Sequence, residues 1–158
     1  MKTKSRHEIL AQLQASQEEL SALLTSVAEQ QDWKPAPEQW SFRFVAAHLA
    51  ASEKECLQPR LKQMASGSQS HFDFYNNSET DFSRTDLRVS LLAWKETRQE
   101  ISSFVQDLDE ETLTYIAHHD SFGDISILDY LDIWLEHDRE HLQDLTRALI
   151  SFDQKRED

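Results

Sequence analysis

Two histidines near the C-terminus, His137 and His141, stand four residues apart in the segment WLEHDREHLQDL. If this segment is helical, residues four apart lie one above the other on the same face. The residues expected on the same face include Trp134 and Leu145, so both imidazoles should point inward or into a cleft. Buried imidazoles need partners for their ring nitrogens, and one shared divalent cation would serve both. The alternative is that both are ordinary polar residues.

The local motif HDREH differs from the zinc-protease pattern H-E-x-x-H, because Asp138 replaces the catalytic glutamate and is one methylene shorter. The chain ends at residue 158, so few residues follow His141. The carboxylates among them are poorly placed to supply a third ligand from a later helix: Asp144, Asp153, Glu157 and Asp158. The spacing therefore argues against a metalloprotease.

A third ligand is expected upstream, and His48 in the segment WSFRFVAAHLAASEKE is the candidate. It lies in the middle of an expected helix, on the side that also carries Val45, Leu49 and Ser52. A single histidine on such a face is often a core residue with satisfied hydrogen bonds. Three imidazoles on two facing helices, however, can bind one divalent ion and leave positions open for water or substrate.

Other polar residues near these histidines have two interpretations each. Asp138 is the one candidate for a catalytic general base, although a residue next to a ligand on a helix points ~100° away from it. A solvated carboxylate is the favoured interpretation for Asp138, and also for Glu53 and Glu55. Asp144 could orient an imidazole. Arg98 could contact an anionic substrate, but pairing with a carboxylate of a neighbouring helix is favoured.

The remaining candidates are weaker. Trp134, one turn before His137, is expected to form a pocket wall, and Cys56 lies too far along its helix to share a metal with His48. We expect the other histidines on the surface, although the adjacent pair in IAHHDSFGD could rim a cleft: His7, His71, His118 and His119.

Four amphipathic helices are expected to position these residues. Apolar residues recur at helical spacing over residues 5–30, 42–57, 85–107 and 126–152. Ser41 and Ser126 are expected N-caps, and Pro59 is expected to end or kink the second helix. Residues 58–84 and 108–124 are expected to form long connections, and a short turn is expected near Glu110 in the second. The pattern predicts an all-α four-helix bundle formed by residues 1–152, followed by a frayed tail at 153–158.

Composition supports this reading and limits the possible partners. The chain has 158 residues, with only 2 glycines and 3 prolines, which favours helices over sheets and loops. Its net charge of -13 argues against nucleic acid and anionic membranes as partners. One cysteine, no signal-peptide pattern and no long apolar run indicate a cytoplasmic protein.

The same residues resemble a known family, the DinB-like proteins. The resemblance rests on Trp40, Ser41, His48 and Leu49, on the G-x-I-S-I pattern at residues 123–127, and on H-D-x-x-H-L at residues 137–142. It extends over nearly the whole chain and includes the W-x-P connection at residues 33–35. Asp144 is a departure, since many members have glutamine there.

The resemblance implies a four-helix bundle with a divalent metal, often nickel or zinc, held by His48, His137 and His141. Some relatives use a low-molecular-weight thiol, in transfer or isomerisation, and many have no known activity. We therefore expect a metal-dependent enzyme that acts on a small molecule, of the thiol-S-transferase or hydrolase type. The alternative is a non-catalytic bundle with a structural metal or a protein-interaction role. A homodimer is plausible under either reading.

Overall fold

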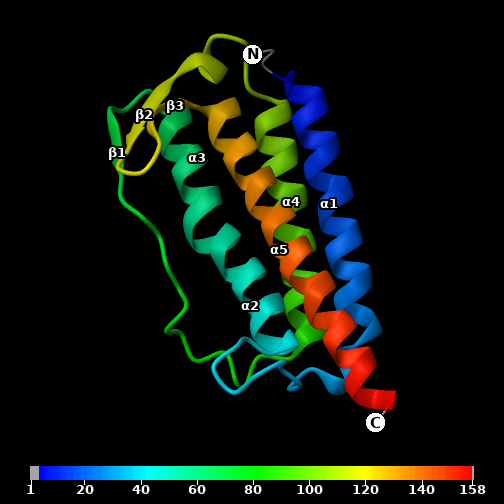
Figure 1. Cartoon of the computed structure of the whole chain (residues 1–158). Coiled ribbons are helices and arrows are strands. Elements are labelled where there is room, and N and C mark those ends of the chain that lie inside the picture. Colours follow the sequence, from blue (N-terminus) through cyan, green and yellow to red (C-terminus); the bar gives the residue numbers. More distant parts are fainter. Residues whose placement is uncertain (1–3, 158) are drawn as a thin grey trace.

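Four long helices build the molecule in the computed structural model, which describes residues 4–157. They are α1 (Arg6–Ser26), the continuous α2 (Phe42–Ser52) and α3 (Gln58–Ala65), α4 (Leu87–Gln106) and α5 (Ile127–Glu157). Helices α1 and α5 run in one direction, and α2–α3 and α4 run in the other (Figure 1). The connection from α3 to α4 therefore travels back along the whole bundle. The predicted four-helix bundle is confirmed.

Side chains at the helix starts explain where the helices begin. Ser41 accepts a hydrogen bond from the Phe44 amide at 3.1 Å, and Asp86 caps α4 in the same way. Ser126 accepts from the Asp129 amide at 3.1 Å while the Asp129 carboxylate accepts from the Ser126 amide at 2.9 Å. These reciprocal bonds satisfy amides that have no partner within a helix. Ser41 and Ser126 are thus N-caps, as the sequence predicted.

Pro59 does not end the second helix, contrary to one of the two expectations for it. The helix continues past it, because the five residues Glu53–Leu57 form a π-helical turn, labelled η2, between α2 and α3. In this turn the Gln58 amide donates to the Glu53 carbonyl, five residues back. Proline has no amide proton to donate. Pro59 lies in the first turn of α3, where a backbone amide needs no hydrogen-bond acceptor within that helix.

The two long connections contain a small sheet that the sequence analysis did not predict. Strand β1 (Ser70–Phe72) pairs in parallel with β2 (Ile116–His119), which pairs antiparallel with β3 (Gly123–Ser126). Gly123, at the turn between β2 and β3, has a φ of 74°, which favours glycine. Short 3₁₀ turns occur at Ala28–Gln30 and Thr112–Thr114, the latter close to the turn expected near Glu110. The sheet covers one end of the bundle (Figure 1).

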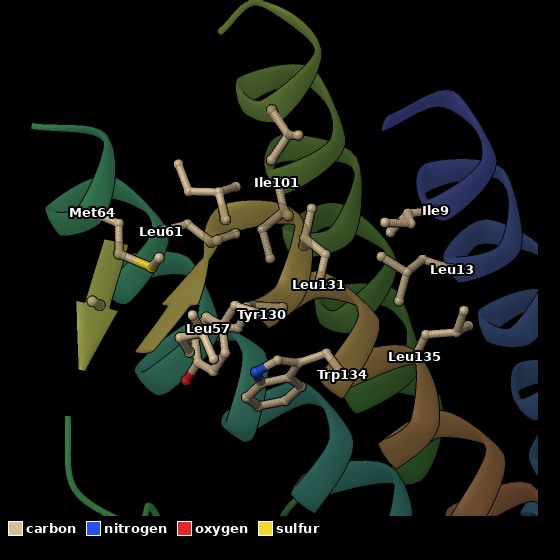
Figure 2. Packing of buried hydrophobic residues seen from close by; sticks show 14 of the residues in the cluster. Ile9, Leu13, Leu57, Leu61, Met64, Ile101, Tyr130, Leu131, Trp134 and Leu135 are labelled. Atoms are coloured by element: carbon tan, nitrogen blue, oxygen red, sulfur yellow. The ribbon is translucent and has the colours of Figure 1, made fainter. Parts of the chain in front are cut away.

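Apolar side chains form two separate core clusters among the described residues. One lies towards the sheet and includes Leu57, Leu61, Ile101, Tyr130 and Leu131 (Figure 2). The other lies towards the C-terminus of α5 and is built around large side chains including Leu24, Phe42, Trp94 and Phe152. On each helix, the residues between the two clusters include buried polar ones: Gln17, Ser52, Glu53, Thr97, Arg98 and Asp138. A polar layer thus crosses the middle of the bundle.

Two further expectations concern the C-terminal tail and the absence of a membrane-spanning segment. Helix α5 continues to Glu157, so residues 153–157, which were expected to fray, are helical. Phe152 is buried in the second cluster and anchors this last part of the helix. No helix within residues 4–157 combines the length and the apolar character that crossing a membrane would require.

Candidate metal centre

The three histidines singled out in the sequence come together in the structure. His48 projects from α2, and His137 and His141 project from α5. The Nε2 atom of His141 lies 3.1 Å from Nε2 of His48 and 3.2 Å from Nε2 of His137. Imidazole nitrogens bound to one zinc ion at about 2.0–2.1 Å, with tetrahedral or octahedral angles, lie about 2.9–3.4 Å apart. The measured spacing fits a single ion. We call these residues the histidine cluster.

An asparagine that the sequence analysis missed fixes the orientation of His48. Buried Asn77, in the connection between β1 and α4, has its Oδ1 atom 2.5 Å from Nδ1 of His48. Its Nδ2 donates to the Ser52 hydroxyl at 3.1 Å and to the Tyr75 hydroxyl at 3.2 Å. The amide oxygen therefore faces His48, whose Nδ1–H donates to it. This tautomer leaves the lone pair of His48 Nε2 directed at the other two histidines.

All three imidazoles are held in their neutral form. Burial lowers the pKa of His48, His137 and His141, and for His141 burial together with the two neighbouring imidazoles lowers the pKa to about 3. Metal ligation requires neutral histidine, so the cluster is ready to bind without losing protons near neutral pH. Three neutral rings cannot satisfy one another's Nε2 lone pairs, whereas one cation would satisfy all three.

Aromatic rings enclose the cluster. Trp40 packs on His48 with ring centroids 4.7 Å apart and stacks on His141 at 6.3 Å. Trp134 packs edge-on against His137 at 5.4 Å, so it does form a wall beside the histidines as expected. In Figure 2, Trp134 and Tyr130 of α5 both point towards Leu57 in the turn that joins α2 to α3. These rings reduce contact with water and lower the local dielectric constant.

Two pockets reach the cluster from different sides. A pocket of about 120 Å³ is lined by His48 and His137 together with Ser52, Cys56, Tyr130 and Trp134. A second, of about 490 Å³, is lined by His141 together with Trp40, Phe42 and Asp144. The histidines therefore lie between two hollows and are not sealed inside the core.

A second polar group, the arginine cluster, lies behind the histidines. Arg98 of α4 donates to both carboxylate oxygens of Asp138, at 2.7 and 3.2 Å, and to Glu53. It also donates to the Leu13 carbonyl at 2.7 Å, and Ser16 donates to Asp138, so the cluster joins all four helices of the bundle. Glu53 and Asp138 raise the pKa of Arg98 despite its burial, and burial raises the pKa of Glu53.

These contacts revise the expectations for three residues. The solvated carboxylates expected at Glu53 and Asp138 are wrong, since each residue is only 1% exposed. The pairing of Arg98 with carboxylates of neighbouring elements is confirmed. Both oxygens of Asp138 are engaged by Arg98, so the geometry gives no support to a general-base role for this residue.

The other candidates are placed as follows. Asp144 is exposed and paired with Arg147, and Glu55 is exposed and accepts a hydrogen bond from Tyr75 at 2.8 Å. Cys56 is buried, with its sulfur 3.6 Å from the Tyr130 hydroxyl. His119, expected on the surface or at a cleft, is buried and lines the 120 Å³ pocket.

A separate exposed group lies on the small sheet. His71 and His118 are register partners on β1 and β2, and Asp120 follows β2 with its carboxylate 2.5 Å from Nε2 of His71. Their potential ligand atoms lie within 4.8 Å of one another. Because the group is exposed, any measurement of bound metal must separate it from the histidine cluster.

Comparison with known proteins places this geometry in context. The sequence pattern of the DinB superfamily matches residues 12–145. The fold is similar to that of YfiT from Bacillus subtilis, described as "a probable metal-dependent hydrolase with an unusual four-helix bundle topology", with a TM-score of 0.70, 18% identity, and coverage of 93% of this chain and 89% of that one. It also resembles the DinB-like protein YjoA from Bacillus subtilis, with a TM-score of 0.62, 18% identity, and coverage of 94% and 92%. No curated protein matches the sequence.

Proposed function

Because the chain belongs to the DinB superfamily, we propose that it is a metal-dependent enzyme that acts on a small molecule. In this proposal the histidine cluster binds one divalent ion. The convergence of three neutral Nε2 atoms from two helices, 3.1 and 3.2 Å apart, carries the proposal. Zinc and nickel are the favoured ions, because imidazole suits late first-row metals.

The reaction we favour is hydrolysis, with thiol transfer as the alternative. A divalent ion held by neutral ligands supplies a Lewis acid, which lowers the pKa of bound water towards ~7 and deprotonates a bound thiol. The structural likeness to YfiT, at 18% identity, establishes the fold, and the description of that protein as a probable hydrolase supports the choice of hydrolysis. A low-molecular-weight thiol remains a possible co-substrate.

The chain's own residues have separate tasks in this proposal. Asn77 keeps His48 in the tautomer that presents Nε2, and the rings of Trp40 and Trp134 hold the imidazoles in place. Asp138, bonded to Arg98, fixes the turn of α5 that carries His137 and acts as a positioning residue. No described residue that lines the 120 Å³ pocket carries a carboxylate, so substrate approaches the histidines without a neighbouring negative charge on that wall.

The access to the cluster favours catalysis over a purely structural metal. Structural zinc sites are closed by four protein ligands, whereas catalytic sites have three and leave one position for water or substrate. Three histidines converge here, and pockets lie on both sides of them. An ion that only joined helices would need neither pocket.

Metal content tests the proposal. Untagged protein purified without added metal or chelator is analysed by elemental mass spectrometry, next to His137→Ala and the double variant His71→Ala/His118→Ala. We expect about one zinc or nickel per chain in the wild type and in the double variant, and less than a tenth of that in His137→Ala. The double variant is the matched control, because it removes two exposed histidines and leaves the histidine cluster intact.

Activity is then assayed with small ester, amide and thiol-acceptor substrates. Turnover that requires the metal and disappears in His137→Ala supports an enzyme. A wild-type chain that neither contains nor takes up metal, or one whose metal is lost only in the double variant, contradicts the proposal.

A further inference from the structure

The 120 Å³ pocket contains a cation that the proposed chemistry has not used. Arg60 of α3 lines this pocket together with His48 and His137, and its side chain is 15% exposed. Its guanidinium lies over the ring of Phe72, 4.8 Å from the centroid, which fixes the plane of the group. An arginine held in this way is arranged in advance for a ligand.

Arg60 has hydrogen-bond donors to spare. Nη1 donates to the Tyr130 hydroxyl at 3.2 Å, and Nη2 donates to the carbonyl of Asp73 at 3.0 Å and to its carboxylate at 3.4 Å. A guanidinium has five N–H groups. The contacts within residues 4–157 therefore leave the Nε–H and one Nη1–H of Arg60 without a protein acceptor.

The positive charge of Arg60 is only weakly balanced. Asp73 is its one ion-pair partner among the described residues, and that carboxylate is 85% exposed, so water screens the pair. Burial raises the pKa of Tyr130 to about 12, so the phenol beside Arg60 stays neutral. Glu55, near the rim, accepts a hydrogen bond from Tyr75 and does not contact Arg60.

The mouth of the same pocket is apolar and exposed. Phe74 and Phe122 both line it and are 72% and 52% exposed. Large apolar side chains that are grouped at the rim of a pocket indicate contact with a ligand. Ile133 and Trp134 continue the apolar wall inward to the histidines.

Resting on the proposed function, we infer that the substrate is a small amphipathic carboxylic acid. Its carboxylate accepts a hydrogen bond from one of the spare N–H groups of Arg60, its apolar body lies between Phe74 and Phe122, and its reacting group faces His48 and His137. Hydrogen bonds between a carboxylate and an arginine are stronger than hydrogen bonds between neutral groups. The low dielectric constant of an apolar pocket strengthens them further. Arg60 is thus a specificity-determining residue for substrates that carry this anion.

The test compares two probes with the same carbon skeleton, phenylacetate and 2-phenylethanol. Their dissociation constants are measured by NMR titration of the full-length protein, both as purified and after chelator treatment. We expect phenylacetate to bind at least fivefold more tightly than the alcohol in both preparations. Arg60→Gln should bring the two affinities within twofold of each other, and Arg60→Lys should restore part of the difference.

Arg43→Gln is the matched control. Arg43 is also a partly buried arginine, 16% exposed and paired with an exposed aspartate, but it lies outside this pocket. Arg43→Gln should leave the preference for phenylacetate unchanged. The double variant Phe74→Ala/Phe122→Ala should weaken both probes by a similar factor, because it removes apolar contact without touching the cation.

The outcomes separate this inference from the metal proposal. Equal affinities in the wild type, no binding of either probe, or a preference that survives Arg60→Gln overturns the inference. A preference that vanishes with the metal also overturns it, because the carboxylate would then be binding the ion. A wild-type chain that contains no metal as purified and takes up none, yet prefers phenylacetate through Arg60, contradicts the metal proposal alone.

Discussion

The histidine cluster and the arginine cluster lie next to each other in the same polar layer, yet their hydrogen bonding differs completely. In the arginine cluster, Arg98 donates to two carboxylates and a carbonyl, so its donors have acceptors within the protein, while Oε2 of Glu53 is buried without a partner among the described residues. In the histidine cluster, three neutral imidazoles face one another through their Nε2 atoms, and no ion pair with a described residue holds them together. His137 Nδ1 is also buried, with no partner among the described residues. One cluster joins the four helices, and the other is the one that we propose binds a metal ion.

This difference shows how neighbouring residues of one helix can have different roles. His137 and Asp138 are adjacent in α5, but the helix directs them to different neighbours. Asp138 meets Arg98 and Ser16, and His137 meets His141 and Trp134. The hydrogen bonds of Asp138 keep its turn of helix in place, which fixes the position of the adjacent His137.

The largest expected effect is the loss of the buried cation. Arg98→Met should destabilise the fold by about 3–5 kcal/mol, because it leaves Asp138 and Glu53 buried without their partner. The free energy of unfolding is measured by urea denaturation in the presence of chelator. The control is His137→Ala under the same conditions, which should cost less because no buried charge is left unpaired. Equal losses in the two variants would contradict the contrast between the clusters.

Metal binding should stabilise the folded protein only through the histidine cluster. At a free metal concentration about 100 times the dissociation constant, the wild type should gain about 2.7 kcal/mol over the chelated protein. His137→Ala should gain nothing, whereas His7→Ala, which changes an exposed histidine, should behave as the wild type. The gain is read from urea denaturation with and without metal. A similar gain in His137→Ala would place the bound ion elsewhere.

Acid should lower the free energy of unfolding through His141 of the histidine cluster. The pKa of His141 is lowered from 6.5 to about 3 in the folded protein, so below pH 6.5 the unfolded chain binds the proton first. The resulting loss of unfolding free energy is absent above pH 6.5 and grows as the pH falls towards 3. At pH 5 it amounts to about 2 kcal/mol of lost stability.

His141→Gln provides the matched comparison for this pH effect, since it removes the titrating ring and keeps a polar side chain. Unfolding free energies are measured at pH 7.5 and pH 5.0 with chelator present. The wild type should lose about 2 kcal/mol more than the variant over this interval. Identical losses would mean that His141 does not resist protonation in the folded state.

The smallest expected effect concerns the support of His48. Asn77→Ala removes the acceptor of the Nδ1–H and should weaken metal affinity by about tenfold, at the low end for residues that orient a ligand. Asn76→Ala is the control, because the neighbouring side chain bonds only the Ser78 amide and is exposed. Affinities are measured by competition with a metal-binding dye. An unchanged affinity in Asn77→Ala would show that the rings of Trp40 and His141 hold His48 without it.

The sequence predicted those features that depend on local spacing. The four helices, the caps Ser41 and Ser126, and the shared face of His137 and His141 follow from helical periodicity and short-range hydrogen bonds. His48 could be proposed as their partner because it lies on an apolar face of a second helix and because of the family resemblance.

The features that were missed depend on contacts between distant parts of the chain. Asn77 lies in an irregular connection, and nothing in its neighbourhood indicates that it reaches His48, 29 residues away. Glu53 and Asp138 were taken as solvated because charged residues are usually exposed, and only the position of Arg98, across the bundle, makes their burial possible. The sheet was missed because its short strands pair β1 with β2 across a long separation in sequence.

The π-helical turn at Glu53–Leu57 sets the angular phase of the helix that faces the 120 Å³ pocket. His48, Ser52, Cys56 and Arg60 all line that pocket at intervals of four residues. In a regular α-helix of about 100° per residue, the last of these would be rotated by about 120° from the first. The wider turn accommodates about one extra residue and removes about 100° of that rotation, which leaves about 20°. Arg60 therefore shares a face with His48 only because this turn is wide; in a regular α-helix of the same residues it would be rotated away from the histidines.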